Sequence, residues 1–173
     1  MSTWNDEQAR HVELLTSRHK NMMWVHERSS RQCRAKHLMI TIPTLAVTST
    51  VGFFELMDYE ETPHWVLGVL ALFGTMLTSM SNLLQYAEKA HAHKTAVLQY
   101  QSQILKEETV ILSEAKPEFS SFTAEIAVFQ ESVMGTAPLP NISVIGLFHK
   151  KFHPNVNEVP IILRIGEDAD EIR

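Results

Sequence analysis

Two apolar runs, LMITIPTLAVTSTVGFFELM (Leu38–Met57) and HWVLGVLALFGTMLTSMSNLLQY (His64–Tyr86), decide the fold class of this chain. The first run holds 20 residues with a single charge, Glu55, and the second holds 23 residues with none when His64 is neutral. A helix needs about 20 apolar residues to cross the hydrocarbon core of a bilayer, and both runs reach that length without strand-like alternation. We therefore predict two transmembrane helices. The alternative is a buried hairpin of a soluble protein, but soluble helices of this length normally carry a polar stripe.

The loop between the two runs is short and acidic, so the two helices should be antiparallel neighbours. Residues 58–63 read DYEETP, whereas the outer flanks of the hairpin are basic: Arg28, Arg31, Arg34, Lys36 and His37 precede it, and Lys89, His91, His93 and Lys94 follow it. An excess of Lys and Arg in short flanks marks the cytoplasmic side of a membrane. We expect an integral membrane protein with both termini in the cytoplasm and the 58–63 loop on the outer side of the bilayer.

Helical patterns extend from both ends of the 38–86 hairpin. Residues 1–37 contain no Gly or Pro, which predicts a cytoplasmic N-terminal helix that is capped by Ser2 or Thr3 and continues into the first span. After Tyr86 we expect a helix to about Ala115. Its apolar pairs recur every seven residues and favour lengthwise packing on the N-terminal helix: Val97/Leu98, Ile104/Leu105 and Ile111/Leu112.

A second cytoplasmic helix is predicted after Pro117, with this proline in its first turn and Gly135 at its end. Its apolar residues are spaced alternately by three and four positions: Phe119, Phe122, Ile126, Phe129 and Val133. The polar face carries no Lys or Arg, so we expect it to pack on the other cytoplasmic helices rather than lie in the membrane interface. The cytoplasmic helices would together occupy residues 87–135.

Residues 136–173 differ in character from the rest of the chain. Four prolines separate the short apolar runs ISVIGLF (142–148) and VPIILRI (159–165), and the chain ends with acidic residues. We expect a short irregular or β C-terminal tail on an otherwise all-α membrane protein. The tail would form either a small hairpin packed on the bundle or an extended segment that binds a protein partner by strand addition.

Each arm of the hairpin carries a face of small and polar residues. Small residues let helices approach closely, and hydroxyl groups bond between helices, which is ordinary packing. In a homo-oligomer the same faces would line a water-filled pore, and polar groups at membrane depth tend to be functional. Our candidates for residues that line such a pore are Thr41, Thr44, Thr48, Glu55, Thr75, Ser79 and Asn82.

Part of this face, TSTVGF at 48–53, matches the beginning of the potassium-channel filter pattern T-x-T-V-G-[YF]-G. Phe54 stands where the second glycine of that pattern belongs. Residues 1–37 are also too polar to supply the outer span that such a filter requires. We interpret the string as part of an apolar helix.

Composition and motifs argue against an enzyme and against nucleic-acid binding. The net charge is −5, and no basic stripe lies outside the flanks of the hairpin. Nine histidines occur, but no HExxH or Cys/His metal spacing, no G-x-S-x-G, no P-loop and no dinucleotide motif. We therefore expect no catalytic residue, no metal and no cofactor.

The single cysteine, Cys33, is expected to be a free thiol, with palmitoylation at the membrane edge as the alternative.

A larger pattern spans roughly Trp24 to Ile111. A polar helix with an Arg-rich end (Arg31, Arg34) leads into a two-span hairpin with a very short loop, and a long helix follows that opens E-K-A-H-x-H-K-x-A-V-x-Q-Y and contains His91, His93 and Tyr100. This layout resembles the SLATT family of two-transmembrane domains. Members of that family are thought to be pore-forming membrane effectors in nucleotide-triggered conflict systems, so the resemblance implies a pore-forming role.

Together these patterns predict a homo-oligomeric membrane channel or pore that conducts ions. One hairpin cannot enclose a conduit, so several copies would have to form a closed ring in the lipid bilayer. The alternative is a non-conducting membrane scaffold that recruits a protein partner through its cytoplasmic helices and its tail.

Overall fold

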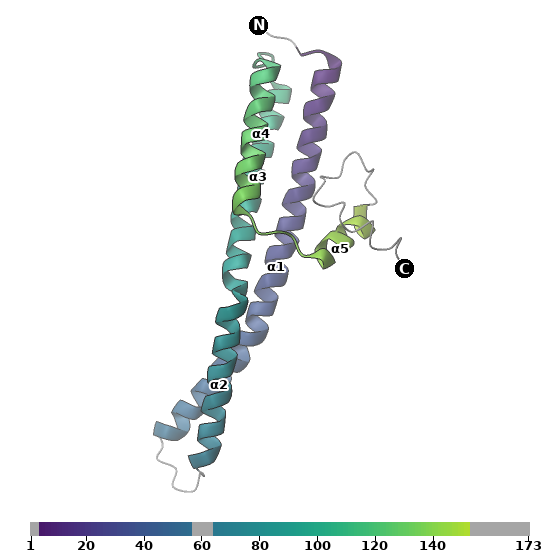
Figure 1. Ribbon diagram of the computed structural model, residues 1–173. Coiled ribbons are helices and arrows are strands. Elements are labelled where there is room, and N and C mark those ends of the chain that lie inside the picture. The colour runs from purple at the N-terminus through teal and green to yellow at the C-terminus, as the bar shows by residue number, and fades with distance from the viewer. Residues whose placement is uncertain (1–3, 57–63, 153–173) are drawn as a thin grey trace. The chain divides into compact units, whose positions relative to one another are not determined.

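The computed structural model describes residues 4–56 and 64–152, and about 90% of these residues are helical (Figure 1). The helices are α1 (Asp6–Leu56), α2 (His64–Leu84), α3 (Tyr86–Leu112), α4 (Phe119–Thr136) and α5 (Ile142–Phe152), and the described ranges contain no strand. The prediction of a helical fold with two long apolar helices is confirmed. The described residues form two compact units, which we call the hairpin unit (Arg31–Ala90) and the bundle unit (residues up to Ser30 and from His91 on).

Helix α1 begins at a capping box formed by Asn5 and Gln8. The Asn5 Oδ1 atom accepts a hydrogen bond of 2.7 Å from the Gln8 backbone N–H, and the Gln8 Oε1 atom accepts one of 3.0 Å from the Asn5 N–H. This reciprocal pair satisfies two N–H groups that a helix start leaves without partners. The cap is therefore Asn5, whereas the caps that we expected, Ser2 and Thr3, lie outside the described residues.

Helix α1 remains one helix over its full length and includes Pro43, as the prediction of a helix running into the first apolar run requires. The string at 48–53 is helical as well. The Thr48 hydroxyl donates to the Thr44 carbonyl at 2.9 Å, and the Thr50 hydroxyl donates to the Ala46 carbonyl at 2.8 Å. The interpretation of this string as part of an apolar helix is confirmed.

Helices α2 and α3 follow each other with a single distortion at Gln85. This residue has φ of 49°, in the left-handed region that non-glycine residues rarely adopt. Hydrogen bonds continue on both sides of it: the Gln85 N–H donates to Ser81 at 3.2 Å, and the Lys89 N–H donates to the Gln85 carbonyl at 3.0 Å. The predicted helix after Tyr86 is present and ends at Leu112, three residues earlier than expected.

The start of α4 differs from the expectation. Pro117 lies outside the helix, before the N-cap residue Glu118, and is not in the first turn. Its carbonyl instead accepts a hydrogen bond of 2.8 Å from the Trp4 indole N–H. The Trp4 ring also contacts the rings of Phe119 and Phe122, so this turn anchors the start of α1 to the start of α4.

The expectation of an irregular or β tail is wrong for residues 142–152, which form helix α5. Asn141 begins it, because its Oδ1 atom accepts the Ser143 N–H at 3.0 Å. Val144, Ile145 and Phe148 are then buried on one face of the helix. Residues 153–173, with the second apolar run and the acidic end, and the 58–63 loop lie outside the described residues.

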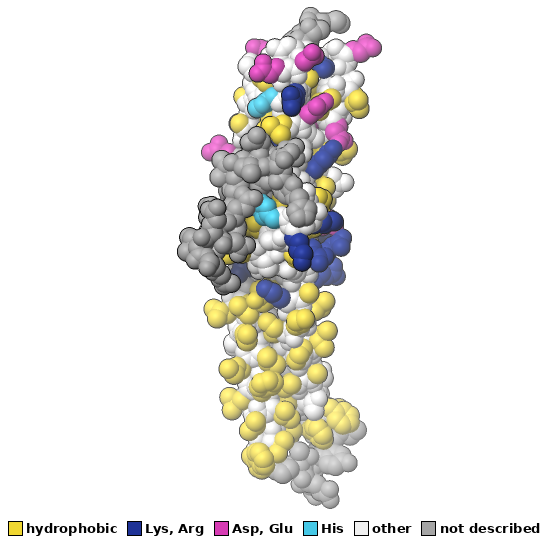
Figure 2. Space-filling model, turned by 90° about the vertical axis from the view of Figure 1, so that its right-hand side faces the viewer, with side chains coloured by type: hydrophobic (Ala, Val, Ile, Leu, Met, Phe, Trp, Pro, Cys, Tyr) yellow, Lys and Arg dark blue, Asp and Glu magenta, His cyan; other side chains and the backbone are white. Residues whose placement is uncertain are grey.

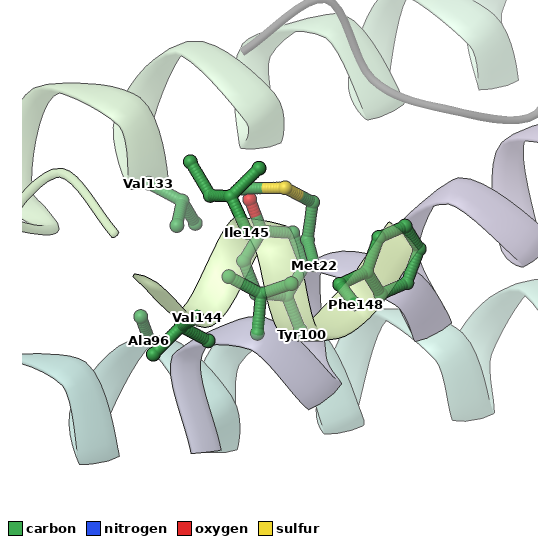
Figure 3. Close-up of a cluster of buried hydrophobic side chains, with 8 residues drawn as sticks. Met22, Ala96, Tyr100, Val133, Val144, Ile145 and Phe148 are labelled. Atoms are coloured by element: carbon green, nitrogen blue, oxygen red, sulfur yellow. The ribbon is translucent and has the colours of Figure 1, made fainter. Parts of the chain in front are cut away.

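The bundle unit contains two apolar clusters. One lies near the α4 start and combines Trp4, which precedes α1, with residues of α1 and α4: Val12, Phe122 and Ile126. The other joins α1, α3, α4 and α5, and Figure 3 shows most of its members: Met22, Val25, Ala96, Tyr100, Val133, Val144, Ile145 and Phe148. The predicted packing of α4 through its apolar face is confirmed by the burial of Phe122, Ile126 and Val133.

The packing face of α3 is not the one that the heptad pairs predicted. Of those pairs only Ile104 is buried, while Leu98, Leu105 and Leu112 are exposed. The buried positions of α3 include three polar residues, His93, Gln103 and Glu107. The prediction failed because a helix buries polar groups when other helices supply their hydrogen-bond partners.

The hairpin unit carries its large apolar side chains on the outside, and Figure 2 shows them covering the visible face of this part of the chain. In the most apolar 18-residue stretch of α1 no residue is buried. In the corresponding stretch of the continuous segment α2–α3, only 6% of the residues are buried. The core helix of a soluble protein would be mostly buried. Both helices are long and apolar enough to cross a membrane. The exposed side chains include Leu38, Met39, Ile42, Leu45, Phe53, Trp65, Leu72, Phe73, Met76 and Leu83.

Candidate functional site

A groove with a volume of about 410 Å³ lies between α1 and α2 in the hairpin unit. Four of the seven residues predicted to line a pore share it, two from each helix: Thr48, Glu55, Thr75 and Ser79. All four are exposed. A fifth polar residue of the lining, Thr78, was not among the predicted residues.

The other three predicted residues do not line this groove. The Thr41 hydroxyl lies 3.4 Å from both ring nitrogens of His37, one turn earlier on α1. The Thr44 hydroxyl donates to the Ile40 carbonyl at 2.8 Å, and both threonines are half-buried. Asn82 is exposed on α2. The structure therefore divides the predicted face into a groove and three residues apart from it.

Gly74 sets the separation of the two helices at the groove. It is the buried residue of α2, and a Cβ atom added to it would lie 3.4 Å from both Val47 Cγ1 and Thr48 Cγ2. Gly52 and Gly68, by contrast, have nothing within 4 Å of such an atom. Close packing through a small residue thus occurs at Gly74. The polar side chains beside it remain open to whatever surrounds the hairpin.

The hydroxyl groups of the groove all donate within their own helices. Thr75, Thr78 and Ser79 each donate to the carbonyl four residues earlier at 2.9 Å, as Thr48 does. The hydroxyl hydrogen is then engaged, while the oxygen retains lone pairs that can accept. The groove therefore presents oxygen acceptors and the Glu55 carboxylate, a set that suits a cation or water better than an anion.

A second polar constellation lies buried in the bundle unit, and the spacing of residues in the sequence did not reveal it. His19 on α1 and Glu107 on α3 are 2% and 0% exposed. The His19 Nδ1 atom is 2.9 Å from Glu107 Oε1, and the Gln103 side chain donates to the same oxygen at 3.0 Å. Gln130 on α4 approaches the other ring nitrogen of His19 at 2.9 Å.

These contacts agree with one protonation pattern of the imidazole. Nδ1–H donates to the Glu107 carboxylate, which leaves Nε2 to accept the amide N–H of Gln130. Residues from α1, α3 and α4 thereby satisfy one another in the core, along the helices between the two apolar clusters. Each of the three helices must keep its register for this polar layer to form.

A pair of buried histidines, His26 on α1 and His93 on α3, forms a second polar contact in the same unit. Their Nδ1 atoms are 2.9 Å apart, each residue is 3% exposed, and the Tyr100 ring stacks on His26 with centroids 5.8 Å apart. One Nδ1 must donate and the other accept, so the contact requires at least one neutral ring. Burial, and to a smaller extent His93, lowers the pKa of His26 from 6.5 to about 4.

Among the described residues, no carboxylate acts on the pKa of either histidine of this pair. Burial also lowers the pKa of His93 and raises the pKa of Tyr100 to about 12, so the phenol stays protonated. The residues that line the small cavity beside His26 from α4 and the following segment are apolar: Val133, Met134, Ala137, Pro138, Leu139 and Pro140. Near neutral pH both imidazoles are therefore uncharged.

Within residues 4–56 and 64–152, no three His, Cys, Asp or Glu side chains converge as a metal site would require. Cys33 is a half-buried free thiol. Comparisons with models of known protein families, with curated proteins and with solved structures find no match to this chain.

Proposed function

We propose that the protein is a homo-oligomeric membrane channel that conducts ions, built on a two-span hairpin like that of the SLATT family. The groove between α1 and α2 carries this proposal, because it collects Thr48, Glu55, Thr75 and Ser79 between two helices whose exposed side chains are mainly large and apolar. Isolated polar groups on a lipid-facing surface are costly and are expected to face water or protein. In a ring of hairpins these groups would face the axis.

The apolar exterior of the hairpin unit supports a position across the bilayer, with lipid in contact with its exposed Leu, Met and Phe side chains. Both termini would lie in the cytoplasm, as the basic flanks indicate. The bundle unit would then stand on the cytoplasmic side, where its buried polar layer holds three helices together.

The test is conductance of the purified full-length protein in planar bilayers. Thr48→Leu, which puts an apolar side chain into the groove, should reduce or abolish the current. Thr50→Leu is the matched control: this threonine makes the same bond to the carbonyl four residues earlier and is exposed, but it does not line the groove. No current from oligomeric protein at any voltage, or equal effects of the two variants, would contradict the proposal.

A scaffold that recruits a partner is the second candidate function, and one observation favours it. The bundle unit has an apolar groove of about 360 Å³ lined by Met23, Trp24, Ile104, Leu105 and Phe152, among others. Leu105→Glu should release a partner bound there. Leu98→Glu is its control, because both leucines are 58% exposed on α3 and only Leu105 lines the groove. Partner binding that is the same for Leu105→Glu and Leu98→Glu in a pull-down with the full-length protein would remove this candidate.

A further inference from the structure

Exposed cationic side chains lie at the end of the hairpin unit that is far from Leu56 and His64 along α1 and α2. Arg34 and Lys36 on α1 and Lys89 on α3 form what we call the basic collar, and all three are exposed. Two observations show that α1 and α3 lie close together at this end. The Lys36 ammonium lies 5.7 Å from the centre of the Tyr86 ring, and the charges of Lys36 and Lys89 both act to lower the pKa of the Cys33 thiol, although burial raises it overall.

The collar differs from the lysines of the bundle unit in its charge balance. Lys20 pairs with Glu108 at 2.7 Å, and Lys106 pairs with Glu125. No described carboxylate lies within ion-pair distance of Arg34, Lys36 or Lys89. The described acid nearest to the collar in sequence is Glu88, which is exposed. The collar therefore carries a surplus of positive charge.

The collar also borders the apolar surface directly. Leu38 and Met39, which are 46% and 74% exposed, follow Lys36 within three residues, and Leu83, which is 83% exposed, precedes Lys89 by six. At a helical rise of about 1.5 Å per residue, these cations lie roughly 3–9 Å beyond the apolar surface, within reach of flexible Lys and Arg side chains. Figure 2 shows Lys and Arg side chains gathered at that edge.

We infer that the basic collar binds the headgroup phosphates of anionic phospholipids whose acyl chains cover the adjacent apolar surface of the hairpin. This inference rests on the proposed position across a membrane. A lipid fits better than an acidic protein, because an anionic phospholipid joins a negative group and an apolar chain in the order that the collar and the neighbouring leucines present. Tyr86, between the two, suits the interface.

The experiment uses the full chain in phosphatidylcholine bilayers that contain spin-labelled phosphatidylglycerol or spin-labelled phosphatidylcholine. Electron spin resonance measures the fraction of each lipid that the protein immobilises. We expect phosphatidylglycerol to be preferred by about fivefold at low salt, with the preference falling towards unity at about 1 M salt as the charges are screened. The triple variant Arg34→Gln/Lys36→Gln/Lys89→Gln should lose the preference.

The matched control removes three lysines of the bundle unit, Lys20→Gln/Lys106→Gln/Lys116→Gln, and should retain the preference at the same net charge. The single variant Lys36→Gln should weaken it and serves if the triple variant does not fold.

Equal immobilisation of both lipids by the wild type overturns the inference and leaves the proposed membrane position intact. No immobilised lipid of either kind overturns both. A wild type that binds inorganic phosphate in detergent but shows no preference between the two lipids has a free-phosphate site, and this outcome also overturns the inference.

Discussion

Gln85 occupies a backbone conformation that costs a residue with a side chain about 1 kcal/mol, because its Cβ atom is crowded when φ is 49°. Glycine has no such cost. Gln85→Gly should therefore leave the free energy of unfolding unchanged or raise it by up to about 1 kcal/mol. Gln101→Gly, an exposed position inside α3, should instead lower it by about 0.5–1 kcal/mol. Thermal unfolding in detergent, followed by far-ultraviolet circular dichroism, compares them, and equal losses would show that the turn needs its glutamine.

Glu55 is the acidic residue of the hairpin groove. If the groove faces a conduit, its carboxylate should favour cations, because hydroxyl oxygens and a negative charge replace part of a cation's hydration shell. Glu55→Gln should reduce the cation-over-anion permeability ratio severalfold, as read from reversal potentials in asymmetric salt. Glu88→Gln, an exposed acid outside the groove, should have little effect. An unchanged ratio in Glu55→Gln would show that this side chain does not face the ions.

At the scale of the helices, the polar layer around Glu107 joins α1, α3 and α4. Glu107→Ala leaves the buried His19 Nδ1–H and the Gln103 amide without an acceptor, which should destabilise the protein by about 3 kcal/mol. Its neighbour Glu108 pairs with Lys20 at the surface, so Glu108→Ala should cost less than about 1 kcal/mol. Thermal unfolding of the two variants is the comparison. Similar losses would mean that the layer is not a stabilising element.

The histidine pair between α1 and α3 predicts a dependence of stability on pH. The pKa of His26 is about 4 in the folded chain and 6.5 when unfolded, so the unfolded chain binds the proton more tightly. The contribution is therefore complete above pH 6.5 and is lost as the pH falls from 6.5 towards 4, on the order of 3 kcal/mol in all. Tryptophan fluorescence during thermal unfolding at several pH values would show this loss.

Replacing one partner of the pair should flatten that pH profile. His93→Gln keeps a hydrogen-bond partner for His26 and removes a group that titrates, so the stability should fall less between pH 6.5 and 4. His91→Gln changes an exposed histidine two residues earlier on α3 and should leave the profile as it is. If both variants behave alike, the acid sensitivity comes from elsewhere in the chain.

At the scale of the whole molecule, a conducting assembly requires several copies, because the described hairpin contributes only α1 and α2. The protein in mild detergent should therefore give one discrete subunit number by native mass spectrometry. Thr48→Leu should keep that number while reducing the current, because its side chain would face the conduit. A monomer under all mild conditions would contradict the channel and favour the scaffold.

The amino-acid sequence by itself determined the local structure of most of the chain. A helix closes its hydrogen bonds four residues apart, so local patterns were sufficient to predict α1, α2 and α4. These patterns are the lack of Gly and Pro before Leu38, the apolar runs that begin at Leu38 and His64, and the three-and-four spacing from Phe119 to Val133. The same local reasoning did not predict α5, because the prolines of residues 136–173 indicated an irregular or β tail. Its apolar face is buried only because α1, α3 and α4 surround it.

Tertiary structure alone decided which polar residues belong together. His19 meets Glu107 across 88 residues and Gln130 across 111, and His26 meets His93 across 67. Each of these side chains, taken alone in the sequence, is compatible with a solvated helix face. Likewise, the polar face of the hairpin became a groove around Thr48, Thr75 and Ser79 because Gly74 lets α2 approach α1. Helices follow from neighbours along the chain, whereas burial of polar groups depends on partners that only the packed helices bring within hydrogen-bonding distance.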